Sequence, residues 1–309
     1  MKVDKFQWDF NKNINRYFDT KYIYKKKTYQ DESYEIEKII NNFKYLKKIK
    51  YKKIKNKKIF NLKNFDEKNY LSKDYLYRKK VLKIREFIKN NNLKKYFNIF
   101  LIHGSLASLD YVKGWSDVDT FVVIKNKVLT SKKKLLKLKI ILKKMYKLFF
   151  SLTKLQHHGL IIFTEIDLDN YLNNYMPIEA LKYNLNFLNN KKIIFKKRIG
   201  PNKKIFEDLV SRYDLLKKSK YNGKYMHHPK DNKYLQVPIR AKNKEMYQLF
   251  CHLGFVNTLP AYYFSAIGKS CCKKDSFKLF EKTKLGKKIK NFLKKSENVR
   301  KKWKANEKK

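Results

Sequence analysis

The sequence has little of three residue types that mark specialised architectures. Its 309 residues include 3 Cys, 5 Pro and 8 Gly. The cysteines (Cys251, Cys271 and Cys272) match neither a disulfide framework nor the ligand spacing of a zinc site. The scarcity of glycine and proline excludes collagen-like, low-complexity and linker-dominated chains. A packed globular protein remains, because 43% of the residues are hydrophobic and 16% are aromatic.

Long apolar runs are also missing. The longest runs, such as 97–102 and 160–163, are far shorter than the roughly 20 residues that a membrane-spanning helix needs. The first ten residues carry Lys2, Asp4, Lys5 and Asp9, so they predict no secretory signal. We therefore expect a soluble, cytoplasmic protein without a membrane span, and the sequence leaves its oligomeric state open.

Arginine is scarce within a large excess of positive charge. The chain has 76 Lys and Arg against 27 Asp and Glu, a net charge of +49, and 7 of the 76 are Arg, which leaves 69 Lys. Such a charge attracts polyanions and makes RNA or tRNA a predicted partner. However, Lys, Asn, Ile, Tyr and Phe dominate the sequence, and all five have AT-rich codons. Codon drift would add lysine without functional demand and would remove arginine, the better phosphate ligand. The charge alone leaves both explanations open.

Hydrophobic periodicity predicts an α/β (α+β) core with a small mixed sheet at residues 72–170. Helices are expected at 72–91 and 130–152, and strands at 97–102, 118–124 and 160–163. The helix at 130–152 crosses between the second and third strands, so these two strands should be parallel. We expect residues 1–71 to form an N-terminal extension that is irregular apart from a helix at 31–46. We expect a C-terminal helical domain with a basic tail at 171–309. Its helices are predicted at 203–219, 242–267 (ended by Gly268) and 287–304.

The most informative segment is 101–123, LIHGSLASLDYVKGWSDVDTFVV. Gly104 and Ser105 follow a predicted strand and precede a short helix expected at 106–110. Backbone N–H groups in such a turn form a concave anion site, and glycine lets a phosphate approach the backbone closely. This turn therefore predicts a phosphate-binding site.

Two acidic residues follow at the start of the next strand. Asp117 and Asp119 are two positions apart, which places both carboxylates on one face of the strand. Two such anions repel each other unless a cation lies between them. Mg²⁺ is the natural cation, because it binds one or two carboxylates and completes its coordination with phosphates and water.

The Gly104-Ser105 turn, followed by Ser116-Asp117-Val118-Asp119 on a strand, resembles the signature of polymerase-β-like nucleotidyltransferases. The resemblance implies that Gly104 and Ser105 hold a nucleoside triphosphate (NTP) and that Asp117 and Asp119 bind two Mg²⁺ ions. It implies transfer of a nucleoside monophosphate to a hydroxyl on RNA, a small molecule or a protein. Residues 259–277 are similar to a segment in helical domains that follow some of these cores. Lys269, Lys273 and Lys274 in this segment are either triphosphate ligands or part of a solvated face, as expected in a chain with 69 Lys.

The family pattern includes a third acid on a later strand, level with the first two. Here that level falls on residues 156–159, Gln-His-His-Gly, while Glu165 and Asp167 lie at the far end of the strand. Three alternatives follow. His158 takes the third position as a base or metal ligand, or the strand differs in register or direction, or catalysis is impaired. In the last case the chain is a nucleotide- or RNA-binding module of the same fold. A protein that regulates a partner protein is a further functional class, and no residue of the sequence supports or excludes it.

Overall fold

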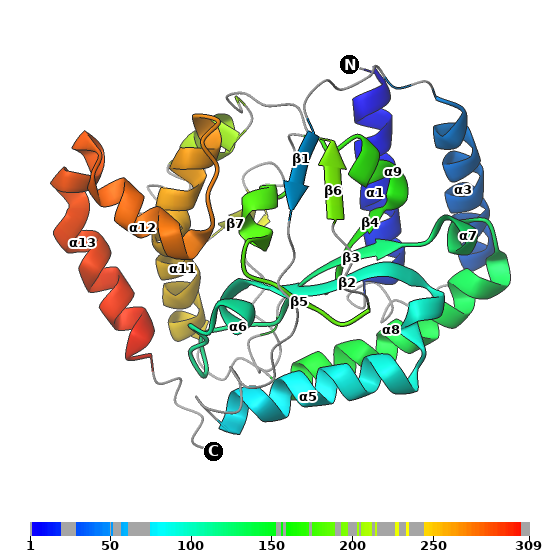
Figure 1. Ribbon diagram of the computed structural model, residues 1–309, viewed down its shortest axis with the longest axis horizontal. Coiled ribbons are helices and arrows are strands. Elements are labelled where there is room, and N and C mark those ends of the chain that lie inside the picture. Colours follow the sequence, from blue (N-terminus) through cyan, green and yellow to red (C-terminus); the bar gives the residue numbers. More distant parts are fainter. Residues whose placement is uncertain are drawn as a thin grey trace.

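The computed structural model (Figure 1) describes most of the chain. The described residues are 2–19, 29–49, 51, 57–60, 75–152, 156, 159–172, 175–188, 193–196, 203, 205–211, 214, 226–228, 233–234 and 244–303. Within them a small mixed sheet lies at the centre, with helices around it. The protein is therefore of the mixed α+β class.

The central sheet has four strands in the order β4-β3-β2-β5. Its strands are β2 (Phe97–His103), β3 (Asp119–Ile124), β4 (Ile161–Thr164) and β5 (Leu185–Asn186). Strand β2 runs antiparallel to β3, with His103 opposite Asp119, and also antiparallel to β5. Strands β3 and β4 are parallel, with Phe121 opposite Ile161. The predicted small mixed sheet and its parallel third strand are confirmed.

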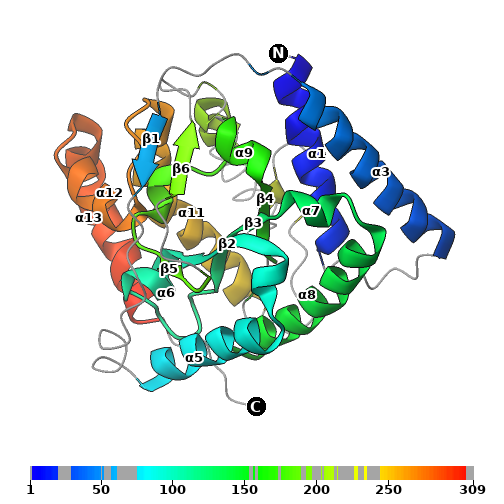
Figure 2. The same ribbon diagram turned by 45° about the vertical axis from the view of Figure 1, so that its right-hand side comes forward.

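Four helices cover one face of this sheet, as Figure 2 shows. They are α1 (Lys2–Phe18), α3 (Tyr29–Lys48), α5 (Tyr75–Asn90) and α8 (Lys132–Leu152). Their buried residues form one cluster with Val122 and Ile124 of β3 and Ile162 of β4. The short elements η1 (Leu93–Lys95) and α7 (Asn126–Leu129) connect these layers.

A second apolar cluster covers the opposite face. Phe121 of β3 stacks on Phe163 of β4, with ring centroids 4.5 Å apart, and both pack against side chains that follow β4, such as Tyr171. This layer includes α9 (Glu165–Asp169) and η2 (Ile178–Leu181). It also includes β6 (Ile193–Lys196), which pairs with β1 (Lys57–Phe60). Both faces of the sheet are thus covered, which explains why its strands read as continuous apolar runs in the sequence.

Three helices form the C-terminal part of the described chain: α11 (Lys244–Ala266), α12 (Lys273–Glu281) and α13 (Lys284–Lys301). Phe264, Phe280 and Leu293 form their shared core. Gly268 ends α11 with a positive φ of 77°, as the sequence predicted. A short hairpin, β7 (Met226–His228) and β8 (Lys233–Tyr234), precedes them. No helix in the described ranges is both long and apolar enough to cross a membrane.

Helix α1 is the main departure from the prediction, because the sequence pattern of the first residues looked irregular. The buried side of α1 mixes apolar and polar side chains: Phe10 and Ile14 are buried beside Gln7 and Asn11. These polar residues interrupt the hydrophobic period from which a helix is recognised. The predicted helix at 203–219 is described only in part, and residues 205–211 are helical. The domain boundaries at 72 and 171 stay predictions.

Candidate active site

The predicted phosphate turn and the predicted acidic strand meet at one edge of the sheet. Helix α6 (Gly104–Ser108) begins directly at the end of β2, with Gly104 at a φ of 70°. A Cβ atom on Gly104 would lie 2.1 Å from Oδ2 of Asp119, so any other residue would displace the Asp119 carboxylate. The positive φ favours glycine here, and the missing side chain leaves the space that this carboxylate occupies.

The loop between α6 and β3 is held by its own hydrogen bonds. The Ser116 hydroxyl accepts a hydrogen bond from Val112 N at 2.9 Å, and Ser116 N donates to Val112 O at 2.8 Å. At the start of the loop, Asp110 N donates to Ser105 O at 3.1 Å. These contacts fix the chain on both sides of residues 111–115, and Asp117 follows immediately.

A buried amide holds the peptide between the two predicted metal ligands. Gln156 is 1% exposed, and its side-chain oxygen accepts from Val118 N at 2.9 Å. Its side-chain nitrogen donates to Val118 O at 3.2 Å. Because Val118 lies between Asp117 and Asp119, this pair of bonds fixes the peptide planes that orient both carboxylates.

Lys273 is the first residue of α12. Solvent reaches its side chain, yet the protein around its ammonium group desolvates it and lowers the pKa of Lys273. The positive charge of Arg300 lowers this pKa further. Three carboxylates act on the ammonium in the opposite direction, those of Asp110, Asp119 and Asp117. The structure thus brings a cation from the C-terminal helices next to the predicted acidic pair.

The other two candidate lysines differ from Lys273. Lys274 donates to Ser108 O at 3.0 Å and lies over the ring of Tyr183, so it is engaged by the protein. Lys269 is exposed. Lys273 is the candidate lysine whose ammonium interacts electrostatically with both Asp117 and Asp119.

The donor set suits Mg²⁺. The carboxylates of Asp117 and Asp119 are hard oxygen ligands, both are partly exposed, and the side chain missing at Gly104 leaves room for Oδ2 of Asp119. Such a pair leaves most of an octahedral coordination shell to water and phosphate oxygens. The residues present therefore fit a magnesium ion bound together with a triphosphate.

The later acids lie at the other end of the sheet, as the sequence predicted. Thr164 pairs with Ile124, five residues beyond Asp119 along β3, about 17 Å at a strand rise of 3.3 Å. Glu165 follows at that end, where Asn98 donates to it, and burial raises its pKa.

Asp167 has a structural environment at that same end. It is 1% exposed and accepts hydrogen bonds from Thr164, Gln7 and Tyr175. With Thr164 it closes the capping box of α9. Neither Glu165 nor Asp167 can reach the Asp117–Asp119 pair. His158 lies outside the described residues, so its role stays a prediction.

Sequence reasoning missed the groups that support the site. Gln156 was counted only as part of a segment without an acid, and Asp110 was not considered. Arg300 NH1 donates to Asp110 O at 3.4 Å, and its other terminal nitrogen lies 3.8 Å from the Asp110 carboxylate. These residues are 190 positions apart in the chain, so no local pattern links them. Asp110 lies in the sequence between the Gly104 turn and the acidic pair, and this position was the signal from which its place near the site could have been predicted.

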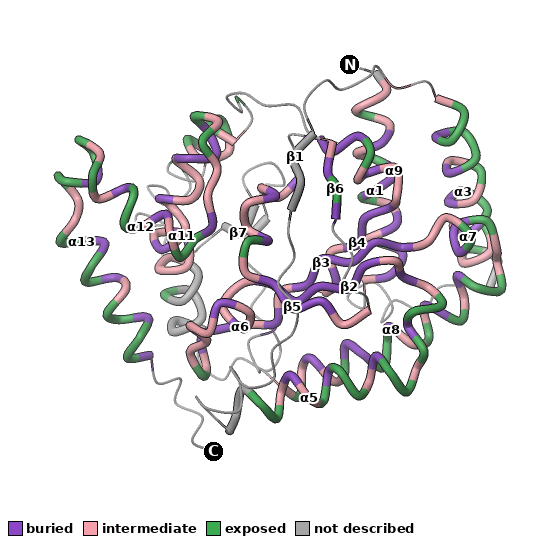
Figure 3. Tube along the Cα trace, in the orientation of Figure 1, coloured by how far each residue is buried: buried purple, intermediate pink, exposed green. Residues whose placement is uncertain are grey.

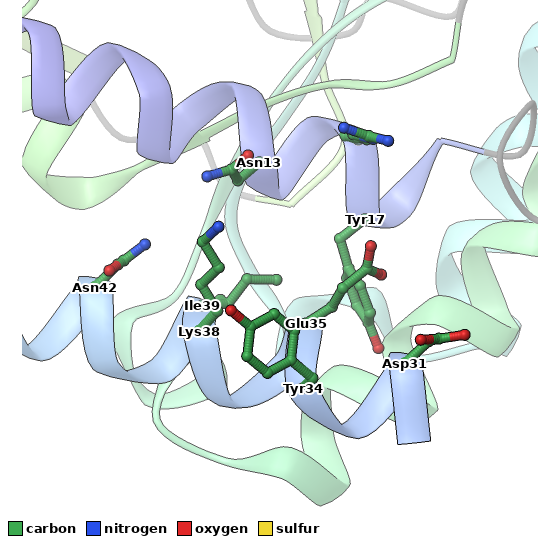
Figure 4. Close-up of a pocket in the computed structure, with 9 residues that line it drawn as sticks. Asn13, Tyr17, Asp31, Tyr34, Glu35, Lys38, Ile39 and Asn42 are labelled. Atoms are coloured by element: carbon green, nitrogen blue, oxygen red, sulfur yellow. The ribbon is translucent and has the colours of Figure 1, made fainter. Parts of the chain in front are cut away.

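A separate cavity of about 340 Å³ lies between α1 and α3 (Figure 4). Arg16, Tyr17, Asp31 and Glu35 are among its lining residues. Both helices pack on the face of the sheet opposite to the layer of Phe121, and Asp119 shares the face of Phe121 by strand alternation. This cavity is therefore not part of the candidate active site.

No protein-family model, curated protein or solved structure matches this chain.

Proposed function

We propose that this chain is a Mg²⁺-dependent nucleotidyltransferase that moves a nucleoside monophosphate from an NTP to a hydroxyl acceptor. The observation that carries the proposal is the contact between the Gly104 turn and the Asp119 carboxylate, where a Cβ would lie 2.1 Å from Oδ2. A backbone turn suited to phosphate and a carboxylate pair suited to Mg²⁺ would serve the same substrate at this edge. The motif alone had predicted both groups, and their proximity is the additional support.

In this proposal Gly104 and Ser105 bind the terminal phosphates of the NTP through backbone N–H groups. Asp117 and Asp119 hold Mg²⁺, which neutralises phosphate charge when bound. The acceptor hydroxyl oxygen forms a bond to the α-phosphorus, the bond from that phosphorus to the bridging oxygen breaks, and pyrophosphate leaves. The hydroxyl proton passes to a base, for which His158 is the candidate. The protein contributes mainly positioning and charge.

Lys273 supports the proposal from the C-terminal helices. Its ammonium is close enough to Asp117 and Asp119 for their charges to raise its pKa against the effect of desolvation. A triphosphate bound to the same metal would bring further negative charge to that ammonium. We assign Lys273 to the neutralisation of the phosphates.

Labelled transfer tests the proposal directly. The full chain is incubated with Mg²⁺ and each of the four α-labelled NTPs, against total RNA, small hydroxyl compounds and cell protein. We expect label transfer and pyrophosphate release, and we expect Asp117→Asn to abolish both without loss of fold, because the metal loses a charged ligand. Asp169→Asn is the matched control, since Asp169 is exposed and paired with Lys196 at the end of α9. Full activity in Asp117→Asn would contradict the proposal.

A second candidate function is nucleotide or RNA binding without turnover. It is favoured by one observation: Glu165 and Asp167 lie at the end of β4 that is far from Asp119, and the residues that precede β4 in the sequence include Gln156, His157 and His158 instead of an acid. In that case Mg²⁺ and NTP bind together, Asp117→Asn weakens this binding, and no pyrophosphate is released with any acceptor.

A further inference from the structure

The outward face of α13 carries lysine and apolar side chains in two parallel lines. Lys288 and Lys295 of α13, and Lys302 at its C-terminal cap, are exposed and seven positions apart, which is about 10.5 Å per step along a helix axis. Leu285, Phe292 and Val299 form the neighbouring line with the same spacing, and Phe292 is 57% exposed. Figure 3 shows exposed positions recurring along the whole length of this helix.

The acidic residues nearest along α12 and α13 pair with other basic residues than these three lysines. Glu297, the one acidic residue of α13, lies 3.1 Å from Lys301 and 3.9 Å from Arg300. Lys290, on another side of the helix, pairs with Glu281 of α12 at 3.4 Å. Among the described residues, Lys288, Lys295 and Lys302 form no ion pair. Their charge is available to an external anion.

The C-terminal end of α13 reaches the candidate active site. Arg300 contacts Asp110, and Trp303 packs edge-on against Trp115 with ring centroids 5.0 Å apart. Trp115 is two residues before Asp117. A ligand that follows the lysine line toward its C-terminal end is therefore led to the loop that carries the acidic pair.

We propose that the outward face of α13 binds single-stranded RNA and, on the proposed function above, presents that RNA as the hydroxyl acceptor. The lysine line neutralises successive phosphates, and the exposed ring of Phe292 offers a stacking surface for a base. A membrane surface fits less well, because an interfacial helix needs a continuous apolar face. Here the apolar side chains are about 10.5 Å apart, with lysines beside them. A second copy of this chain would repel the same face by like charge.

Helix α8 provides a matched control for general lysine excess. It holds eight lysines in 21 residues, KKKLLKLKIILKKMYKLFFSL, and packs on the opposite face of the sheet. Lys133, Lys134 and Lys137 are exposed in its first half. That half is next to α3, where Lys132 donates to Ser33 at 2.8 Å. If codon drift explains all the lysines, neutralisation of α8 and of α13 should weaken RNA binding equally.

The test compares two triple variants of the full chain. Binding of a fluorescent single-stranded RNA with a free 3′-hydroxyl is followed by anisotropy at several salt concentrations. We expect the α13 variant (Lys288→Gln, Lys295→Gln, Lys302→Gln) to bind at least tenfold more weakly. Its salt slope should fall by about 2, at roughly 0.7 per phosphate contact. The α8 variant (Lys133→Gln, Lys134→Gln, Lys137→Gln) should change affinity by less than about threefold. Phe292→Ala should weaken binding about fivefold or more without changing the salt slope.

The possible results separate the surface from the catalytic proposal. Equal effects of the two triple variants, or no RNA binding by the full chain, overturn the α13 surface. So does binding of α13 to vesicles with about one third phosphatidylserine in the absence of RNA binding. RNA binding through α13 without label transfer to the 3′ end supports the surface and contradicts the role of RNA as the acceptor, while transfer to the other hydroxyl acceptors tests the nucleotidyltransferase separately. If the α13 variant transfers label to RNA as well as the unaltered chain does, the α13 surface is excluded and the nucleotidyltransferase proposal is retained.

Discussion

Two amide side chains in this protein take the place of a neighbouring β-strand. Gln156 bonds to both Val118 N and Val118 O, and Asn15 of α1 bonds to both Ile162 N and Ile162 O. Each amide supplies one donor and one acceptor, as a strand residue does. A buried backbone group that lacks a hydrogen bond costs about 1–3 kcal/mol. At Ile162 the carbonyl also accepts from Asn11 at 3.0 Å, so the bond from Ile162 N to Asn15 is the one that Asn15 alone supplies among these amides. One of these amides supports the acidic pair, and the other completes the edge of β4.

Replacement of Gln156 by methionine tests the positioning of the acidic pair. Gln156→Met keeps the size of the side chain and removes both bonds to Val118, so we expect about 2 kcal/mol of lost stability. We also expect a large loss of label transfer, because the peptides that orient Asp117 and Asp119 lose their support. Denaturant unfolding and the transfer assay measure the two effects.

Asn15→Leu is the matched control for this variant, because it removes a similar amide pair at Ile162, far from the acids. We expect it to reduce stability while leaving transfer unchanged. If both variants reduce transfer equally, Gln156 has only a general structural role.

At the scale of elements, the junction between α12 and the core is made of specific polar contacts. Lys182, directly after η2, lies 2.5 Å from Asp275 in the first turn of α12. This hydrogen bond lowers the pKa of Asp275 and raises the pKa of Lys182. The neighbouring Lys274 bonds to Ser108 O in α6. These contacts place the start of α12, and therefore Lys273, beside the Gly104 turn.

The Lys182–Asp275 pair gives the stability of this junction a defined pH dependence. Because the pKa of folded Asp275 is lowered, its contribution is present above about pH 4 and is lost as the pH falls through the lowered pKa. Both side chains are partly exposed, so we expect a coupling of less than about 1 kcal/mol. A double-mutant cycle with Lys182→Met and Asp275→Asn, repeated at neutral and acidic pH, measures it. A coupling that persists when Asp275 is protonated would exclude the ion pair as its source.

The elements that the sequence predicted correctly are those with a regular local pattern. Strands β2, β3 and β4 and helices α3, α5 and α8 agree with the predicted positions to within a few residues. Helix α12 was missed because it is short, and α1 was missed because Gln7 and Asn11 are buried among its apolar residues. The pairing of β1 with β6 joins Lys57 to Lys196. These residues are so far apart in the sequence that no local pattern predicts their pairing.

At the scale of the whole molecule, the candidate site is assembled from distant parts of the chain. Gly104 and Asp119 could be paired from the sequence, because one motif contains both. The contribution of Lys273 and the contact of Trp303 with Trp115 depend on how the C-terminal helices dock. The net charge of +49 gave no location for a ligand, since α8 and α13 are both rich in lysine. Only the structure shows which of these helices ends at the acidic loop.

Removal of the Trp303 ring should loosen the loop before Asp117. An edge-on aromatic pair contributes about 1 kcal/mol beyond its buried area. We therefore expect Trp303→Ala to speed amide hydrogen exchange at residues 110–116 about tenfold and to reduce label transfer. Exchange in β2 and β3 should not change. For the exchange measurement, Phe292→Ala is the control, because it removes an exposed ring from α13. Unchanged exchange at 110–116 would mean that α13 does not hold this loop.

The pairing of Trp115 with Trp303 also has a consequence for protein synthesis. A ribosome completes β2, β3 and β4 long before it reaches residue 303, and their mutual contacts are close enough in sequence to form early. The segment that leads to Asp117 gains its contact with Trp303 only after α13 is complete. A nascent chain that has not yet reached residue 303, or one cut short within α13, would therefore hold a formed sheet whose acidic edge is still loose.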